Sequence, residues 1–210
     1  MGTVFGKVTV PQARYEVLAR MAGGLEVRKY SAAVVAVTRM QEGGQSAAFQ
    51  RLAAYIGVSR TPENLSCEGT GPIMTSPVLM TGGGDQRVPE AISMTAPVLL
   101  GETEKDNECE MSFILPQDRY SFVDQAPVPT NAAVQVRPMP EHLRAVVRYT
   151  GAYSDADGAE RAAAIYEAIE GSDKYELAQG QRFDRAAFNS PLSLPWLRTN
   201  EVQVAIREQI

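Results

Sequence analysis

The chain has 210 residues, of which 44% are hydrophobic and 21% are charged, a length and composition typical of one globular domain with a sizeable core. Its net charge of -5 offers no basic surface of the kind on which nucleic-acid binding depends. No segment reaches the roughly 20 apolar residues that span a bilayer, and residues 1–15 lack the pattern of a secretory leader or transit peptide. We therefore expect a single domain over residues 1–210, with a core at about 15–207, in a cytoplasmic protein without a nucleic-acid partner; a monomer is favoured.

The first third of the chain predicts three strands and a helix. Residues 15–20 and 25–30 alternate between apolar and polar side chains on either side of two glycines, which predicts an antiparallel hairpin. The β-branched run at 32–38 predicts a third strand. Apolar residues recur at helical spacing over residues 45–56, and Gly57 is a typical stop, so we expect an amphipathic helix there.

The middle of the chain contains one short phrase twice. The sequence M-T-[SA]-P-V-L occurs at residues 74–79 and again at 94–99, with a glycine-rich loop between the copies. Proline cannot donate to a β-ladder and is confined to strand starts, edges and bulges. The repeat therefore predicts two strands of one sheet that bend at Pro77 and Pro97. A further strand is expected at 111–115.

The last third repeats the order of the first. Residues 117–130 are rich in turn formers and predict a surface connection. The expected elements after it are strands at 134–137 and 143–149, a helix at 155–169 whose apolar face holds Ala159, Ala162, Ala163, Tyr166 and Ile169, and strands near 175–178 and 202–206. Strands, helix and strands thus occur twice, which favours one α+β domain of two related halves that share a curved antiparallel sheet.

Five phrases in this chain resemble, in the same order, those of the SOUL/HBP haem-binding family. They are E-V-R-K-Y at 26–30, L-A-A-Y-I at 52–56, the doubled M-T-x-P-V, M-S-F-I-L-P at 111–116, and F-N-S-P at 188–191 with R-T-N-E-V at 198–202. The doubling is similar to plant and algal members and implies a photosynthetic eukaryote as the source. The resemblance implies a distorted antiparallel β-barrel of two pseudo-repeated halves flanked by two α-helices, and reversible binding of haem or another tetrapyrrole.

The resemblance also implies where such a ligand binds. A porphyrin is a flat apolar disc with two carboxylates at one edge, so it needs an apolar cleft and cations at the rim. In the family the cleft lies between the first helix and the loop before the last strand. Carried over, the two walls are formed by Phe49, Leu52 and Ala53, and by Leu192, Leu194, Pro195, Trp196 and Leu197.

The second wall is also notable by itself, because a proline-broken loop that displays three leucines and the only tryptophan is typical of a binding surface. The alternative is that this loop packs onto the barrel as a cover for the core. Arg51 and Arg198 are the candidate partners of the propionates. Each arginine is alternatively an ordinary surface charge.

The iron ligand is a separate question. His142 is the only histidine, and histidine is the commonest haem ligand, but it falls in a polar turn and is expected at the surface. Lys29 stands where some family members have a histidine in the E-[VI]-R-x-Y phrase. Ligation by tyrosine, cysteine or methionine stays open, with Met74, Met94, Cys67 and Cys109 as named candidates; the two cysteines lack C-x-x-C spacing. We expect weak coordination of the iron, or binding mainly by apolar contact.

The leading hypothesis is a non-enzymatic carrier or buffer of haem or a related tetrapyrrole. A tetrapyrrole-modifying enzyme, which removes the metal or oxidises the ring, is the second hypothesis. The chain has no H-E-x-x-H phrase and no clustered carboxylates, which favours the first. A third hypothesis is an effector-binding or partner-binding module, because fold does not fix function.

Overall fold

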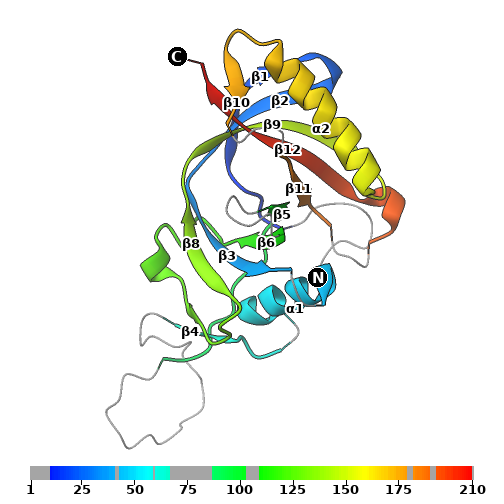
Figure 1. Ribbon diagram of the computed structural model, residues 1–210. Helices are drawn as coiled ribbons and strands as arrows, with labels where there is room; N and C mark the ends of the chain where they lie inside the picture. Colours follow the sequence, from blue (N-terminus) through cyan, green and yellow to red (C-terminus); the bar gives the residue numbers. More distant parts are fainter. Residues whose placement is uncertain are drawn as a thin grey trace, which may run out of the picture.

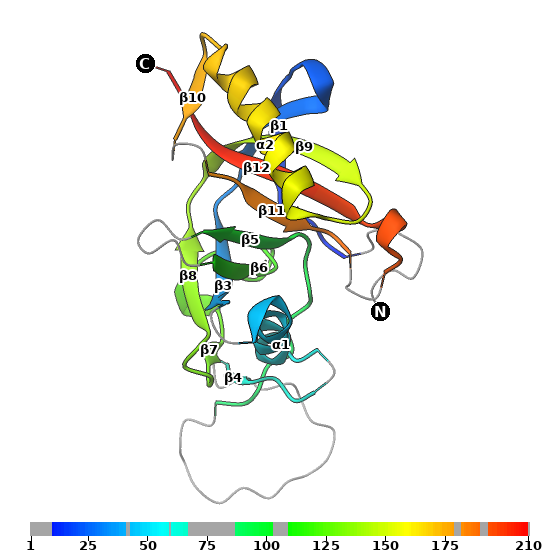
Figure 2. The same ribbon diagram turned by 45° about the vertical axis from the view of Figure 1, so that its right-hand side comes forward.

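The computed structural model describes residues 10–40, 43–58, 60–66, 87–102, 109–178, 182–189 and 193–209. Its main feature is an antiparallel ten-stranded sheet that curls into a half-barrel (Figures 1 and 2). The strands run in the spatial order β1-β2-β9-β12-β11-β5-β6-β3-β8, with β10 beside β12. The α+β class and the curved antiparallel sheet with two helices are therefore confirmed.

The strands of the main sheet are β1 (Tyr15–Arg20), β2 (Leu25–Tyr30), β3 (Ala33–Arg39), β5 (Val98–Glu102), β6 (Cys109–Ile114), β8 (Gln135–Met139), β9 (His142–Thr150), β10 (Tyr175–Leu177), β11 (Asp184–Ala187) and β12 (Thr199–Glu208). A small second sheet pairs β4 (Asn64–Leu65) with β7 (Val128–Pro129). The helices of the described chain are α1 (Gly44–Ile56) and α2 (Asp155–Glu170), and single 3-10 turns lie at Ala22–Gly24, Val123–Gln125 and Pro195–Leu197.

The end of α1 and the start of α2 each have residues that provide the terminal backbone groups with partners. Gly57 ends α1 with a φ of 84°, a left-handed conformation that glycine adopts at little cost, and its N–H bonds to the carbonyl groups of Ala53 and Ala54. Ser154 precedes α2, and its hydroxyl accepts a hydrogen bond from the Asp157 N–H. Neither of these helices is both long and apolar enough to cross a membrane.

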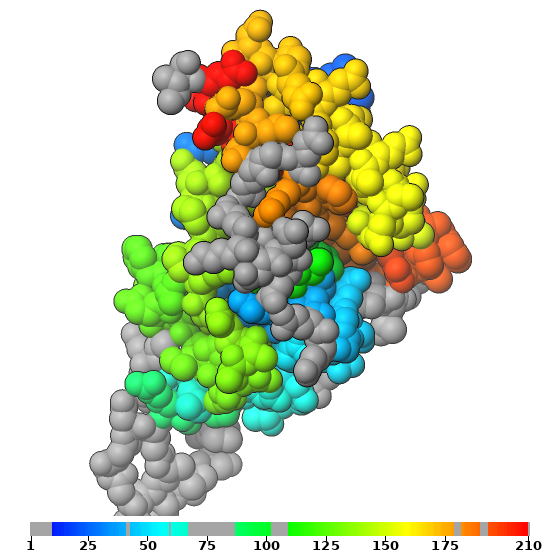
Figure 3. All heavy atoms as spheres, in the orientation of Figure 1, coloured from blue at the N-terminus to red at the C-terminus, as the bar shows by residue number. Residues whose placement is uncertain are grey.

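The two helices lie on the same face of the sheet, over different strands. Leu52 of α1 packs with Met111 and Phe113 of β6, whereas Ile165 of α2 packs with Val202 of β12. In the register, Val202 pairs with Arg185, which pairs with Leu100. Since paired residues point to the same side, these strands present one continuous face. Figure 3 shows α2, in yellow, and α1, in cyan, at separate ends of that face.

The opposite face lines the inside of the curl and contains a buried ion pair. Arg28 Nη1 lies 2.9 Å from Glu201 Oε1, and these side chains are 3% and 0% exposed. Glu26 pairs with the same guanidinium at 2.7 Å. Gln203 Nε2 donates to the second oxygen of Glu201 at 2.9 Å. Buried charges are tolerated when each has such partners, so this network belongs to the folded framework.

Several expected elements have the predicted position and two details differ. The hairpin of β1 and β2, the strands β3 and β6, and both helices are confirmed. In α2, however, the buried residues are Gly158, Ala162, Ile165 and Ile169, while Ala159 and Ala163 are exposed. The prediction of the buried face is therefore right for Ala162 and Ile169 and wrong for Ala159 and Ala163. Alanines occur on both sides of this helix, so its buried and exposed faces differ little in hydrophobicity.

The second copy of the repeated phrase is a strand only after its proline. β5 begins at Val98, so the expectation of a strand that continues through Pro97 is wrong for residues 92–97. Ala96 instead bonds to the chain start, because its N–H donates to the Pro11 carbonyl at 2.8 Å and its carbonyl accepts from Ala13 N–H at 3.0 Å. The first copy, with Pro77, lies outside the described residues.

Candidate functional site

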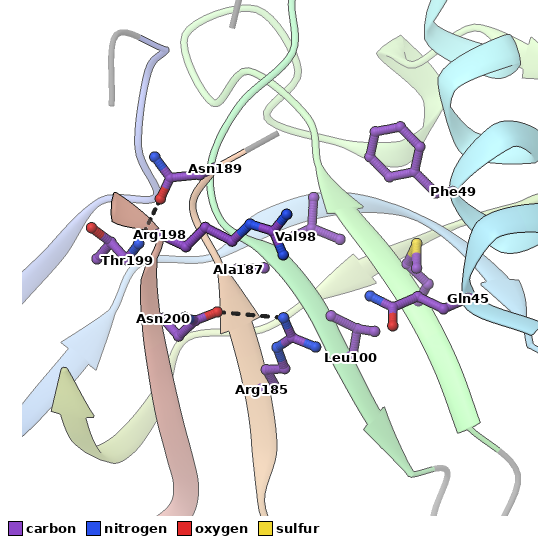
Figure 4. A pocket seen from close by; sticks show the side chains of 11 residues that line it. Gln45, Phe49, Val98, Leu100, Arg185, Ala187, Asn189, Arg198, Thr199 and Asn200 are labelled. Atoms are coloured by element: carbon purple, nitrogen blue, oxygen red, sulfur yellow. Dashed lines mark hydrogen bonds between the residues drawn. The ribbon is translucent and has the colours of Figure 1, made fainter. Parts of the chain in front are cut away.

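A pocket opens beside α1 on the face of the sheet that carries both helices (Figure 4). It is shallow, with an enclosed volume of about 100 Å³ within a hollow of about 520 Å³ that includes open solvent. The side chains around it come from α1, β5, β6, β11 and the start of β12. The lining residues are Gln45, Phe49, Val98, Leu100, Met111, Arg185, Ala187, Asn189, Arg198, Thr199 and Asn200.

The helix wall consists of Gln45 and Phe49, one turn apart on α1. Phe49 is half-buried and meets Phe113 edge to face, with 5.4 Å between the ring centroids. Its neighbour Ala48 points into the core, so Phe49 lies at the edge of the buried face of the helix. This position leaves part of an aromatic ring available to the pocket (Figure 4).

The floor of the pocket is apolar and comes from the sheet. Val98 and Leu100 are alternate residues of β5, and Leu100 pairs with Met111 of β6. Ala187 of β11 pairs with Val98 on the same face. Because alanine has only a methyl group, the strand at this point leaves space above the floor. The arrangement gives an apolar surface against which a flat ring can lie.

The rim opposite α1 is polar and comes from β11 and the start of β12. Asn189 Oδ1 accepts a hydrogen bond from the Thr199 N–H at 2.6 Å. Asn200 Oδ1 accepts a long bond from Arg185 Nη2 at 3.4 Å, and Asn200 Nδ2 donates to the Gly151 carbonyl at 2.9 Å. Figure 4 shows Arg185 and Arg198 on this side and Phe49 across the pocket.

The charge of Arg185, on this rim, is only partly compensated. Its guanidinium lies 3.9 Å from the centroid of the Tyr153 ring, and it forms no ion pair with a carboxylate in the described ranges. Burial lowers the pKa of Arg185 below its usual value, and the charge of Arg198 lowers it further. Its Nε group is buried without a hydrogen-bond partner. An anionic ligand group would fit this environment.

Two of the residues that the family resemblance implies lie together in the pocket. Phe49 comes from α1 and Arg198 from the residue just before β12, so the first helix and the segment before the last strand do meet here. Arg198 Nε donates to the Ser193 carbonyl at 2.9 Å, which anchors the side chain beside the loop.

Other implied residues of the helix lie elsewhere. Leu52 and Ala53 are buried, and Leu52 belongs to the core cluster beneath α1. Arg51 reaches back to β3, where its Nε donates to Thr38 Oγ1 at 3.0 Å and its Nη2 to the Arg39 carbonyl. The structure therefore does not bring these three side chains to the pocket surface.

The described apolar residues of the loop before β12 do not line the pocket, although Arg198 at the end of this loop does. Trp196 is 66% exposed and Leu194 is 44% exposed. Leu197 is half-buried, and Pro195 begins the 3-10 turn that contains Trp196. Leu192 lies outside the described residues. The contribution of this loop to a ligand-binding wall stays a prediction.

His142 lies far from the pocket. Its ring stacks on Tyr30 at 5.4 Å with an interplanar angle of 9°, and burial lowers its pKa. It occupies the first position of β9, whereas Thr150 at the other end pairs with Thr199 of the pocket. A strand of nine residues separates the two points by about 25 Å. His142 is half-buried rather than a surface residue, and it does not face this pocket.

The other candidate iron ligands that the structure describes, Met94 and Cys109, do not line the pocket. Met94 packs partly buried against the core under α1, and Cys109 is exposed. Met74 and Cys67 fall outside the described residues. The part of the chain that the structure describes has no group of three or more His, Cys, Asp or Glu residues placed to hold a metal ion.

Sequence reasoning missed the residues of β11 and the amide side chains next to them. Asp184–Ala187 is short and polar, so it gave no strong strand signal. The alternation of Arg185 and Ala187 with Ala186 and Phe188 is a period-two pattern, and it could have indicated a strand with one charged face. That pattern alone could not indicate that Arg185 would lie beside Leu100, because their pairing depends on the fold.

The fold is that of an α+β domain, and its pocket combines an apolar floor with a polar rim that holds two arginines. The chain belongs to the SOUL heme-binding protein family, whose family model matches residues 10–205. This membership supports haem or a related tetrapyrrole as the ligand, and the pocket offers the apolar surface and the cations that such a ligand requires. A search of curated protein sequences found no significant match.

Solved structures with the same fold are distant in sequence. The EcmrR C-terminal domain matches with a TM-score of 0.52 and 10% identity, over 90% of this chain and 100% of that domain. A hydrolase from Listeria innocua has a TM-score of 0.51 and 10% identity, over 87% and 91% of the two chains. An uncharacterized conserved protein from Listeria innocua has a TM-score of 0.51 and 12% identity, over 94% of each. Such likenesses show the fold alone.

Proposed function

We propose that this protein binds haem or a related tetrapyrrole reversibly in the pocket beside α1, and acts as a carrier or buffer of that ligand in the cytoplasm. One observation carries the proposal: an aromatic and aliphatic surface faces two arginines across a single pocket. A tetrapyrrole with propionates combines an apolar disc and an anionic edge in the same way.

The openness of the pocket supports reversible binding. Its enclosed volume of about 100 Å³ is below the roughly 300–1,000 Å³ of small-molecule sites, so the pocket would hold one edge of a porphyrin and leave the rest of the disc outside. A ligand held in this way leaves without a large rearrangement of the sheet, which suits a carrier.

The proposal assigns most of the affinity to the ring and its carboxylates. Phe49, Val98 and Leu100 would contact the disc, and the arginines would bind the propionates. Met111 has the softest donor atom among the lining residues, but it is 1% exposed and packed into the core under α1. We therefore expect the iron to contribute little to binding by this site.

Titration of the purified protein with hemin tests the function itself. We expect a saturable shift of the Soret band with a dissociation constant below about 10 μM. Absence of saturation would contradict the proposal. Incubation of the complex tests the enzymatic alternative, because loss of iron or bleaching of the ring with multiple turnovers would replace the carrier role by a catalytic one.

The location of the site is tested by Gln45→Glu. Gln45 is exposed and lines the pocket, so the new carboxylate should leave the fold intact and repel the ligand's propionates. We expect the dissociation constant for hemin to rise roughly three- to tenfold. Gln50→Glu is the matched control, since Gln50 is exposed on the same helix but does not line the pocket. Equal affinities of the two variants would move the site elsewhere.

A further inference from the structure

Arg185 has hydrogen-bonding capacity that the described protein does not use. A guanidinium has five N–H donors in a fixed planar arrangement. Here Nη2 makes the long bond to Asn200 Oδ1 at 3.4 Å, Nε is buried without a partner, and Nη1 makes no hydrogen bond to a described residue. The face of the guanidinium is covered by Tyr153. The side chain is therefore held in place by packing but is incompletely paired.

Other desolvated arginines on the sheet have carboxylate partners. Arg28 pairs with Glu201 at 2.9 Å, and Arg144 pairs with Asp184 at 2.5 Å. Arg185 is half-buried like Arg144, yet no described carboxylate forms an ion pair with it: Asp155 acts on it only from beyond ion-pair distance, and the charge of Arg198 opposes its own. Removing a cation from water without a counter-charge costs free energy that an anion in the pocket would offset.

We propose that Arg185 binds a carboxylate of the ligand and so fixes the orientation of the ligand in the pocket. This inference rests on the proposed function, and within it the carboxylate is a propionate of the tetrapyrrole. The propionate edge then lies against β11 and β12. The apolar part of the disc that the pocket holds lies against Phe49 and Leu100 (Figure 4).

The orientation defines which tetrapyrroles the site accepts. A ring with a free propionate pairs with the planar guanidinium through charge-assisted hydrogen bonds. A ring whose propionates are esterified cannot make that ion pair, although its apolar disc is unchanged. Arg185 is thus a specificity-determining residue that favours free-acid tetrapyrroles over their esters.

The test compares two ligands and two proteins. Hemin and its dimethyl ester are titrated into the wild type and into Arg185→Gln, in one buffer with the same low concentration of detergent. We expect the substitution to weaken hemin binding by about tenfold or more, as loss of a charge-assisted pair does. The ester should bind both proteins within about twofold, because it makes no ion pair with Arg185.

Arg161→Gln is the matched control. Arg161 is also a cation over a tyrosine ring, with its guanidinium 4.2 Å from the centroid of Tyr149, but it does not line the pocket. We expect this variant to bind hemin as the wild type does. A loss as large as that of Arg185→Gln would overturn the proposal, because it would reduce the effect to the net charge of the protein.

Arg185→Lys keeps the test decisive if Arg185→Gln does not fold. Lysine preserves the charge but not the planar pair of donors, so we expect a smaller loss of hemin affinity and no change for the ester. Hemin binding at wild-type strength by every folded Arg185 variant would overturn the role of Arg185 and leave the proposed function standing. Failure of the wild type to bind either ligand would instead overturn the proposed function.

Discussion

Each face of the sheet holds a desolvated arginine, and the two arginines differ in the partners of their guanidinium groups. Inside the curl, Arg28 is 3% exposed and pairs with Glu201 and Glu26. On the helix-bearing face, Arg185 has a tyrosine ring and one long bond to an amide oxygen. Burial of a charge therefore does not by itself indicate a binding site. What distinguishes the pocket is the incomplete pairing of its cation.

A single step along β12 produces this difference. Asn200 and Glu201 are consecutive residues of one strand, so their side chains point to opposite faces. The inner face receives a carboxylate that neutralises Arg28, and the helix face receives an amide that does not neutralise Arg185. An amide holds the guanidinium in position and leaves its charge available to a ligand.

The largest expected effect comes from breaking the inner pair. Glu201→Gln leaves Arg28 buried with only part of its counter-charge, and we expect the free energy of unfolding to fall by about 3 kcal/mol. Urea unfolding followed by circular dichroism measures it. Glu176→Gln is the control, because the pair of Glu176 with Arg207 is exposed and should be worth less than about 1 kcal/mol. Similar losses in both variants would contradict the contrast between the two environments.

A smaller effect is expected when the inner network is titrated. Burial raises the pKa of Tyr30 to about 12 from its usual 10.0, and the neighbouring Glu201 charge adds to the rise. The neutral phenol is therefore favoured by folding, so this stability is complete below pH 10 and is lost as the pH rises from 10 to 12. About 2–3 kcal/mol is at stake for a shift of this size.

Urea unfolding of the wild type and Tyr30→Phe at pH 9, 10 and 11 measures this contribution. At neutral pH the variant loses only the hydrogen bonds that the hydroxyl accepts from Arg28 and Gln203. We expect the wild type to lose stability faster than Tyr30→Phe above pH 10. Parallel curves for the two proteins would show that the phenol does not titrate as its burial requires.

The smallest effect is expected from a substitution that gives Arg185 a carboxylate partner, as Arg28 has on the inner face. Asn200→Asp places a carboxylate on Arg185, and the ligand's propionate then competes with an internal partner. We expect the dissociation constant for hemin to rise roughly three- to tenfold, measured by Soret titration. Asn131→Asp adds the same charge on a loop that does not line the pocket and should bind as the wild type. Unchanged affinity in Asn200→Asp would indicate that Arg185 does not meet the ligand.

The fold could be predicted where a segment carries its own periodic pattern. The hairpin of β1 and β2 and the helix α1 have a clear alternation or helical spacing and a glycine at the boundary. Residues 92–97 could not be placed in this way. Ala96 bonds to Pro11 and Ala13, and the Ile92 N–H donates to the Ile56 carbonyl at 3.0 Å. Backbone bonds to distant segments of this kind leave no local signal in the sequence.

The pocket could be predicted only in part for the same reason. Phe49 and Arg198 could be named as pocket residues from the family resemblance, because the resemblance implies a site between the first helix and the segment before the last strand. The position of Arg185 depends on the pairing of β11 with β5, a strand more than 80 residues earlier in the chain. Leu52 and Ala53 lie on the same helix as Phe49 but on its buried side, a distinction that the helix sequence alone does not settle.

The bonds between Ala96 and residues 11–13 matter for anyone who engineers this chain. Ala96 precedes Val98 of the pocket floor by two residues, and Val10 packs against the same small cluster as Ala96. Replacing the first fourteen residues by a fusion partner would remove the contacts that hold Ala96. The position of Val98 in the pocket floor would then be less well fixed. A reporter joined after β12 instead follows Glu208, at the end of the strand away from Thr199. The C-terminus is thus the better attachment point for a fluorescent sensor built on this domain.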